Sequence, residues 1–163
     1  MKMTEKIKII QTNELDEKAK QQAFHLWNNE YSENLSYNSL AEFDKYLENL
    51  TQLKHYLLTF DTDQILGWAW TFDREREKWF AIILSEEIQG KGFGRKILNE
   101  LKQVETVLNG WVVDHSNYIK KNGLPYISPL KFYQKCGFKI LTDVRLELDS
   151  ISAVKILWTK EME

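Results

Sequence analysis

The chain has few of the residues that build disulfide frameworks, metal sites or membrane spans. It contains one cysteine, Cys136, and three histidines among 163 residues. A single thiol cannot form an internal disulfide, which fits a reducing cytoplasm, and the scattered histidines lack the spacing of metal ligands. No apolar run reaches the roughly 18 residues that a transmembrane helix needs. We therefore expect a cytoplasmic protein with no metal and no membrane partner.

Charge of either sign is not in excess. The formal net charge is −2 at pH 7, 28% of the residues are charged and 43% are hydrophobic. Without a basic stripe we expect no nucleic-acid partner and no attraction to an anionic membrane. Residues 1–6 lead into an isoleucine-rich strand rather than the apolar core of a signal peptide. Length and composition predict a single domain over residues 1–163.

A glycine-rich segment stands between an apolar run at 79–84 and a helical pattern that extends to about Leu108, before Gly110. Its residues are Gln89, Gly90, Lys91, Gly92, Phe93, Gly94 and Arg95. The first N–H groups of a helix have no intrahelical partner, and the helix dipole adds partial positive charge there. Glycines let a phosphate approach and permit positive φ, while the two cations add charge. The segment therefore predicts a diphosphate-binding loop.

The pattern of this loop distinguishes it from two common phosphate loops. The triphosphate loop G-x-x-x-x-G-K-[S/T] is absent, and the dinucleotide fingerprint G-x-G-x-x-G is missed by one residue. The segment does match Q/R-x-x-G-x-G/A, and so the chain closely resembles the GNAT superfamily of N-acetyltransferases. The alternative is a tight strand-to-helix turn that binds nothing.

A second motif, SPLKFYQKCGF, occupies residues 128–138, about 40 residues further on. It contains F-Y-x-K-x-G-F, which the same superfamily often carries. Ser128 is a favourable N-cap, Pro129 suits the first position of a helix, and Gly137 suits the residue after its end. We expect a short helix over 129–136 and a strand from about Phe138. Two motifs in this order are more specific than either alone.

Hydrophobic periodicity predicts the element order β-α-α-β-β-β-α-β-α-β-β. The expected strands lie at 6–11, 55–60, 65–72, 79–84, 111–114, from 138 and at 154–160, and the first two helices begin after caps at Asn13 and Ser39, the latter in a capping box with Glu42. This order gives a mixed sheet with helices on both faces, an α/β architecture. The resemblance implies in addition that the sheet splays open between the strands at 79–84 and 111–114.

The resemblance implies transfer of an acetyl group from acetyl-CoA to a primary amine. Residues 89–95 would hold the CoA pyrophosphate, and the pantetheine arm would bind along the strand near Ile82 and Leu84. Phe132 of the second motif is also expected beside the cofactor. Tyr126 stands where many relatives have an asparagine that contacts CoA, so Ser128 or the backbone amides at the helix start are the expected substitutes.

Tyr133 is the candidate general acid, because a phenol with a pKa near 10 can donate a proton to the departing sulfur. The two motifs do not specify the general base. Histone-type relatives carry a glutamate eleven residues before the motif glutamine, where this chain has Lys78. Asp114 and His115 are local candidates, and proton loss through ordered water is the alternative.

Aromatic residues are expected at the acceptor site, where they suit a partly apolar or cationic amine. The candidates are Trp27, Tyr31, Trp70 and His115, with Tyr37, Trp68 and Trp111 as further members of such a wall. The acceptor would be a small-molecule or peptide amine. A non-catalytic acyl-CoA binding or sensing module is the rival function, and a general phosphate-ester binder is a third. A homodimer stays open, since no residue indicates the oligomeric state.

Overall fold

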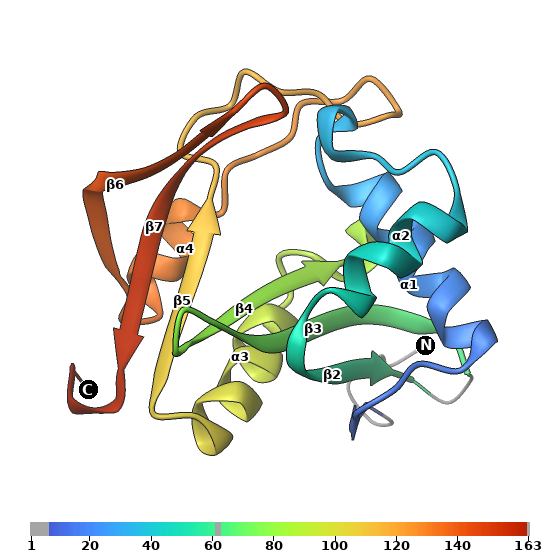
Figure 1. Cartoon of the computed structure of the whole chain (residues 1–163), viewed down its shortest axis with the longest axis horizontal. Coiled ribbons are helices and arrows are strands. Elements are labelled where there is room, and N and C mark those ends of the chain that lie inside the picture. Colours follow the sequence, from blue (N-terminus) through green and yellow to red (C-terminus); the bar gives the residue numbers. More distant parts are fainter. Residues whose placement is uncertain (1–6, 61–62, 163) are drawn as a thin grey trace.

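The computed structural model describes residues 7–60 and 63–162 and contains the predicted elements in the predicted order (Figure 1). The strands are β1 (Lys8–Thr12), β2 (Thr51–Thr59), β3 (Ile65–Arg74), β4 (Glu77–Leu84), β5 (Val107–Val112), β6 (Lys139–Leu148) and β7 (Ile151–Thr159). The helices are α1 (Glu17–Glu30), α2 (Leu40–Glu48), α3 (Phe93–Val104) and α4 (Leu130–Lys135), with 3₁₀ turns η1 (Glu33–Leu35), η2 (Glu86–Ile88) and η3 (Lys160–Met162). The expectations for residues 1–6 lie outside the described part of the chain, as do residues 61 and 62 between the strands expected at 55–60 and 65–72.

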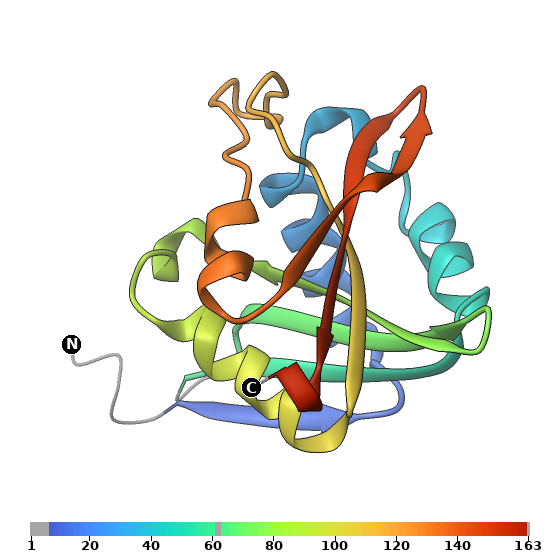
Figure 2. The ribbon, with the colours of Figure 1, turned by 90° about the vertical axis from the view of Figure 1, so that its left-hand side faces the viewer.

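All seven strands belong to one sheet in the order β1-β2-β3-β4-β5-β7-β6. Neighbouring strands are antiparallel except β4 and β5, which are parallel and pair at a single position, Trp79 with Asn109. Beyond that position the two strands diverge, and Figure 2 shows β5 and β7 running steeply across the flatter β2, β3 and β4. The predicted splayed, mixed sheet is confirmed, and the backbone of β4 after Trp79 has no strand partner on this side among the described residues.

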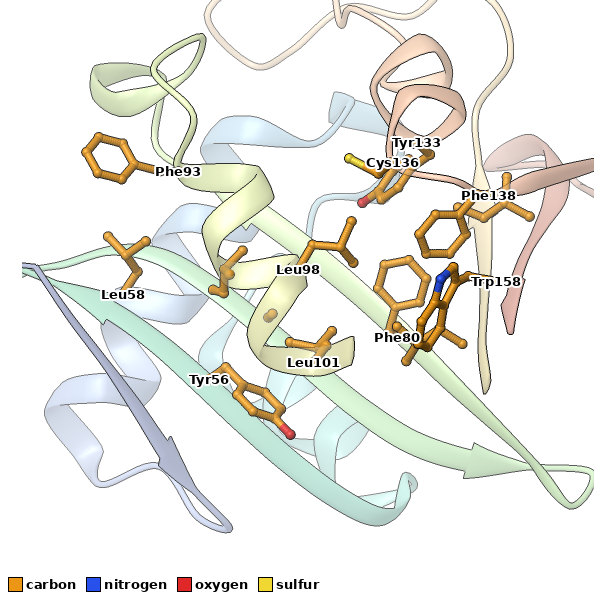
Figure 3. Close-up of a cluster of buried hydrophobic side chains, with 14 of the residues drawn as sticks. Tyr56, Leu58, Phe80, Phe93, Leu98, Leu101, Tyr133, Cys136, Phe138 and Trp158 are labelled. Atoms are coloured by element: carbon orange, nitrogen blue, oxygen red, sulfur yellow. The ribbon is translucent and has the colours of Figure 1, made fainter. Parts of the chain in front are cut away.

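Helices cover both faces of the sheet, as predicted. Helices α1 and α2 pack on one face around Phe43, Trp68 and Trp70, all of which are almost fully buried. Helices α3 and α4 pack on the other face, where Phe80, Phe138 and Trp158 gather beside Tyr133 (Figure 3). Alternate residues of β3 and β4 point into the two cores, as strand geometry requires.

The helix boundaries correct three predictions. Helix α1 begins after Asp16, whose carboxylate accepts the N–H of Ala19 at 2.8 Å, and not after Asn13. Helix α3 ends at Val104 instead of near Leu108. Gly110, expected to mark the end of that helix, lies within β5, where an added Cβ would come within 3.0 Å of the Phe80 ring. Close packing, not a turn, therefore requires the glycine.

Two other local predictions hold. The Ser39 hydroxyl accepts the N–H of Glu42 at 3.2 Å and caps α2. Gly137 follows the end of α4 with a φ of +91°, a conformation that favours glycine. Helix α4 itself starts one residue later than predicted, because Pro129 is its N-cap. No helix in residues 7–60 and 63–162 is long and apolar enough to cross a membrane.

Candidate functional site

A cavity of about 550 Å³ opens where β4, the glycine-rich loop and the start of α4 meet. Its walls are formed by Glu30, Tyr31, Ile82, Ile83, Leu84, Gln89, Gly90, Gly92, Gly94, Arg95, Tyr126, Ile127, Ser128, Pro129, Phe132 and Tyr133. We call it the first cavity. It brings together the two sequence motifs, which are about 40 residues apart in the chain, because α3 and α4 pack on the same face of the sheet.

Two glycines of the loop adopt left-handed backbone conformations. Gly90 has a φ of +75° and Gly92 a φ of +89°, and a Cβ at either position would meet no atom within 4 Å. Conformation rather than space therefore favours glycine at both positions. Gly92 is the N-cap of α3 and offers no side-chain cap, so the first N–H groups of the helix lack intrahelical partners. With Arg95 in the wall, this end of the cavity fits a diphosphate.

The third glycine of the loop has a different function. A Cβ on Gly94 would lie 3.1 Å from the ring of Phe132 and 3.4 Å from the side chain of Leu84. Its absence lets the start of α3 pack directly against α4. Phe132 and Leu84, both predicted to bind the cofactor, are thereby held in the wall of the first cavity.

The loop is anchored by Glu30, at the end of α1, which the sequence analysis did not identify. The Glu30 carboxylate accepts the N–H of Glu86 at 2.9 Å and lies 3.4 Å from the Lys120 ammonium. The Gln89 amide donates to the Leu84 carbonyl at 2.9 Å and to Glu30 at 3.4 Å. The partners of Glu30 lie 56 to 90 residues away in the chain, so no local sequence pattern indicates these contacts.

Lys91 and Phe93 do not line the first cavity. The Lys91 ammonium donates to the Glu87 carbonyl at 3.2 Å. The Phe93 ring is buried against Phe60, with ring centres 5.6 Å apart. The side chain of Phe93 therefore belongs to the core, and that of Lys91 folds back along the loop.

Ser128 and Tyr126 stand in the wall where the resemblance expects an asparagine. The Ser128 hydroxyl donates to the Val113 carbonyl and accepts the N–H of Leu130 at 3.3 Å. Its bonding capacity is therefore largely used by the backbone, which fixes the entry of α4. Burial raises the pKa of Tyr126 to about 12, so this phenol is neutral at physiological pH.

Tyr133 lies in α4 with only 6% of its surface exposed, and its ring packs edge-on against Phe80 at 5.7 Å (Figure 3). Burial holds the pKa of its phenol well above the usual range, and nearby Tyr126 and Cys136 add smaller effects. Among the described residues no group forms a hydrogen bond with its hydroxyl. Tyr133 is therefore a protonated donor at neutral pH.

A small cavity of about 40 Å³, here called the junction, lies at the splay of the sheet. It is lined by Tyr133 together with Ala81 and Ile82 of β4 and Gly110 and Trp111 of β5. This volume accommodates about one water molecule or a small functional group. Tyr31 and Tyr126 line the junction, the first cavity and a second large cavity that is described next, so the three spaces adjoin.

Beyond the junction is a second, aromatic cavity of about 260 Å³ between α1, α2 and the C-terminal hairpin β6–β7. It is lined by Trp27, Tyr31, Ser32, Leu35, Tyr37, Tyr46, Trp70, Phe72, Arg74, Trp79, Phe80, Ala81, Trp111, Val113, Tyr126, Leu146, Leu148, Ser150 and Ile151. Of the predicted acceptor residues, Trp27, Tyr31, Tyr37, Trp70 and Trp111 are in this wall. Trp68 is not in it, but it stacks on Trp70 with ring centres 3.8 Å apart.

Asp114 and His115, the sequence-based candidates near the splay, line none of these three cavities. The Asp114 carboxylate forms a two-pronged ion pair with Arg145 at 2.9 and 3.0 Å, and this contact lowers its pKa. The His115 ring packs against Tyr118 and accepts the N–H of Asn117 at 3.1 Å. Both side chains are engaged in holding the loop and the hairpin β6–β7.

The long loop after β5 folds back as an irregular hairpin. The N–H of Tyr126 donates to the Tyr118 carbonyl at 2.9 Å, and Lys120 forms a bridge with Ser32 of the α1–α2 connection. The hairpin thereby carries Tyr126 into all three cavities. The length of the loop gives no sequence signal for which of its residues lines the cavities.

Comparison with known proteins agrees with this geometry. The model of the acetyltransferase (GNAT) domain family matches residues 52–140, which include β4, the glycine-rich loop and Tyr133. The chain belongs to the GNAT acetyltransferase family. No curated protein matches it.

Solved GNAT structures share the fold over nearly the whole chain. An acyl-CoA N-acyltransferase from Pseudomonas aeruginosa has a TM-score of 0.68 and 16% identity, with 93% of this chain and 98% of that chain covered. The spermidine/spermine N-acetyltransferase SpeG from Vibrio cholerae has a TM-score of 0.63 and 15% identity, with 98% and 95% covered. AAC(6')-Ib in complex with ribostamycin and coenzyme A has a TM-score of 0.66 and 12% identity, with 97% and 96% covered.

At these identities the likeness shows the fold and not the substrate.

Within the described residues, no three histidine, cysteine, aspartate or glutamate side chains are grouped to hold a metal ion. The first cavity, with its positive-φ glycines, free helix N-terminus and unpaired edge of β4, fits the extended, diphosphate-bearing acetyl-CoA that the GNAT fold binds.

Proposed function

We propose that this GNAT protein is an N-acetyltransferase that uses acetyl-CoA and acetylates a primary amine by direct attack on the thioester. The observation that carries the proposal is the arrangement of the three adjoining spaces. Tyr133 lines both the first cavity and the junction, and the junction adjoins the aromatic cavity. A donor bound in the first cavity and an acceptor bound in the second would meet beside this phenol.

In this proposal the acyl donor would bind along the unpaired edge of β4 near Ile82 and Leu84. Its diphosphate would bind the N-terminus of α3 at residues 90–94, with Arg95 at the rim. The donor supplies the acetyl group as an activated thioester. Ser128, whose hydroxyl already serves the backbone, would act mainly by fixing the start of α4.

The acceptor nitrogen forms the new C–N bond to the acetyl carbon while the C–S bond breaks, and the sulfur takes the bonding electrons. Tyr133 donates its phenolic proton to that sulfur, the acetylated nitrogen releases a proton to water to give the neutral amide, and the phenolate recovers a proton from solvent. The acceptor amine must also lose a proton before the reaction, because only the neutral amine can attack. Burial in an apolar cavity disfavours the charged ammonium, so proton loss to water on entry replaces a dedicated carboxylate base.

Comparison of wild type with Tyr133→Phe tests this assignment. The phenylalanine keeps the ring contact with Phe80 but removes the only donated proton, so kcat should fall by about 10²–10⁴ while acetyl-CoA affinity is retained. Tyr56→Phe is the matched control, because Tyr56 is buried in the same core but lines none of the three cavities. Equal turnover in Tyr133→Phe would remove the phenol from the mechanism.

The activity itself is tested by following CoA release with a thiol reagent over polyamines, aminoglycosides, amino acids and short peptides. The single protein thiol, Cys136, is buried, which keeps the background low. Turnover with one class would establish the enzyme. Binding of acetyl-CoA with no turnover across the panel would favour the sensing module, and failure to bind acetyl-CoA would overturn both functions.

A further inference from the structure

The aromatic cavity has an unusual distribution of charge for a site that receives an amine. Arg74 is the only charged residue among its described lining residues, and no carboxylate lines it. The tyrosines in its wall are neutral, since burial raises the pKa values of Tyr31, Tyr37 and Tyr46. An ammonium group held deep in this cavity would find aromatic faces but no counter-ion.

Arg74 is an exposed residue whose guanidinium lies over two aromatic rings of the cavity wall. Its guanidinium lies 5.1 Å from the ring centre of Phe72 and 5.6 Å from that of Trp79. Its cross-strand neighbour Glu77 is ion-paired with Lys155 at 3.7 Å instead. No carboxylate within the described residues pairs with Arg74, and a planar guanidinium is well suited to bind one with two hydrogen bonds.

A second, independent feature lies beside it. Trp79 is 5% exposed and lines the cavity, yet its indole nitrogen has no hydrogen-bond partner among the described residues. The indole N–H can only donate, so it requires an acceptor atom. Buried donors without partners are rare in folded proteins. Arg74 and Trp79 therefore place two groups that can only donate hydrogen bonds near one another in this part of the cavity wall.

We propose that the acceptor amine carries an anionic group, of the carboxylate type, that Arg74 and the Trp79 indole N–H bind at the end of the cavity opposite the junction. The inference rests on the proposed acetyltransferase function and specifies its substrate class. Arg74 is thus a specificity-determining residue, and polycationic amines are poor acceptors, because a second ammonium would face Arg74 without a counter-ion.

The strand register sets the length of the acceptor. The guanidinium lies over Trp79, and the junction is lined by Phe80, Ala81 and Ile82, one to three residues further along β4. At about 3.3 Å per residue this spans about 3–10 Å. A charged N–H···O contact takes up about 3 Å of that span. At most about 7 Å then remains between carboxylate and amine, which matches a short amino acid and not a long polyamine.

The test measures binding, so that it does not depend on turnover. Protein saturated with CoA is titrated by calorimetry with L-phenylalanine and with 4-aminobutanoate. Each acid is compared with its carboxamide, which lacks the carboxylate charge, and spermidine is titrated as well. We expect at least one acid to bind about 10–100-fold more tightly than its amide, which corresponds to one charge-assisted pair, and spermidine to bind least. Amides or spermidine binding as tightly as the acids, or no acid binding, would overturn the proposal.

Variants assign the effect to the residues. Arg74→Gln keeps a similar side-chain length, and it should abolish the preference for the acid over the amide and raise the acid's KM. Trp79→Phe should lose part of the preference. Arg76→Gln at the exposed hairpin tip is the matched control and should behave as wild type. Failure of the wild type to bind CoA would instead count against the proposed function.

Discussion

The buried imidazole of His55 should make the fold sensitive to acid. His55 is 2% exposed on β2, and its Nδ1 accepts the indole N–H of Trp68 at 3.0 Å. Burial lowers its pKa to about 4 from an ordinary value of 6.5. Protonation would place a charge in the core and remove the acceptor of this hydrogen bond. Trp68 also stacks on Trp70, which lines the aromatic cavity, so the acid-sensitive group supports the acceptor site.

The size and sign follow from the two pKa values. Because the folded pKa lies below the unfolded one, the neutral imidazole favours folding fully above pH 6.5, and this contribution is lost as the pH falls toward 4. The full difference is worth about 3 kcal/mol, at 1.36 kcal/mol per unit of pKa. Between pH 7 and pH 5 the free energy of unfolding should fall by about 2 kcal/mol from this residue alone.

Urea denaturation at pH 7, 6 and 5 measures this loss. Other groups also titrate, so the informative quantity is the difference between wild type and His55→Asn, whose Oδ1 can accept the Trp68 N–H without titrating. The variant should lose about 2 kcal/mol less than wild type over this range. His25→Asn is the control, since His25 is exposed on α1, and it should follow wild type. Parallel curves for wild type and His55→Asn would refute the reasoning.

Four further predictions concern the loop, the phenol and a helix cap. Gly92→Ala should weaken acetyl-CoA binding and cost about 1–2 kcal/mol of stability in urea denaturation, because φ is +89° there; an unchanged Kd and stability would contradict it. Arg95→Ala should raise the acetyl-CoA Kd about tenfold in a salt-dependent way, while Lys96→Ala, outside the cavity, should not. Turnover should show no alkaline loss below about pH 10, since the pKa of Tyr133 is raised; a loss near pH 8 that Tyr133→Phe removes would contradict this. Asp16→Ala should cost about 1 kcal/mol by urea denaturation through loss of the α1 N-cap, and no loss would count against that cap.

Helix α1 connects the two halves of the candidate site. Its last residue, Glu30, holds the glycine-rich loop and Lys120, and the next residue, Tyr31, lines both large cavities and the junction. The loop that would bind the donor and the wall that would bind the acceptor are therefore attached to the same helix end. A substitution at Glu30 is expected to affect both sites together.

Local signals determined the elements and the loop that would bind CoA. A diphosphate-binding loop could be predicted from Gly90, Gly92 and the helix that follows. Such a loop binds through backbone groups that lie within a few residues of one another. The F-Y-x-K-x-G-F motif and Gly137 near its end predicted the short helix that carries Tyr133, although its N-cap is Pro129 and not Ser128. The extent of α3 was wrong, because the pattern from Val107 to Val112 suits a helix or a strand, and only pairing with β7 decides between them.

The acceptor side depended on the tertiary structure. The sequence named Trp27, Tyr31 and Trp70 as aromatic candidates, but it also named Asp114 and His115, which line none of the three cavities. Contacts across the splayed sheet decide this, since Arg145 engages Asp114 from 31 residues away. In the sequence, Arg74 is one of the consecutive charged residues at 74–78, a pattern typical of a solvated hairpin tip. Its proposed role in binding the acceptor follows only from the strand register and helix packing, which place it over Trp79 at the end of a cavity without carboxylates.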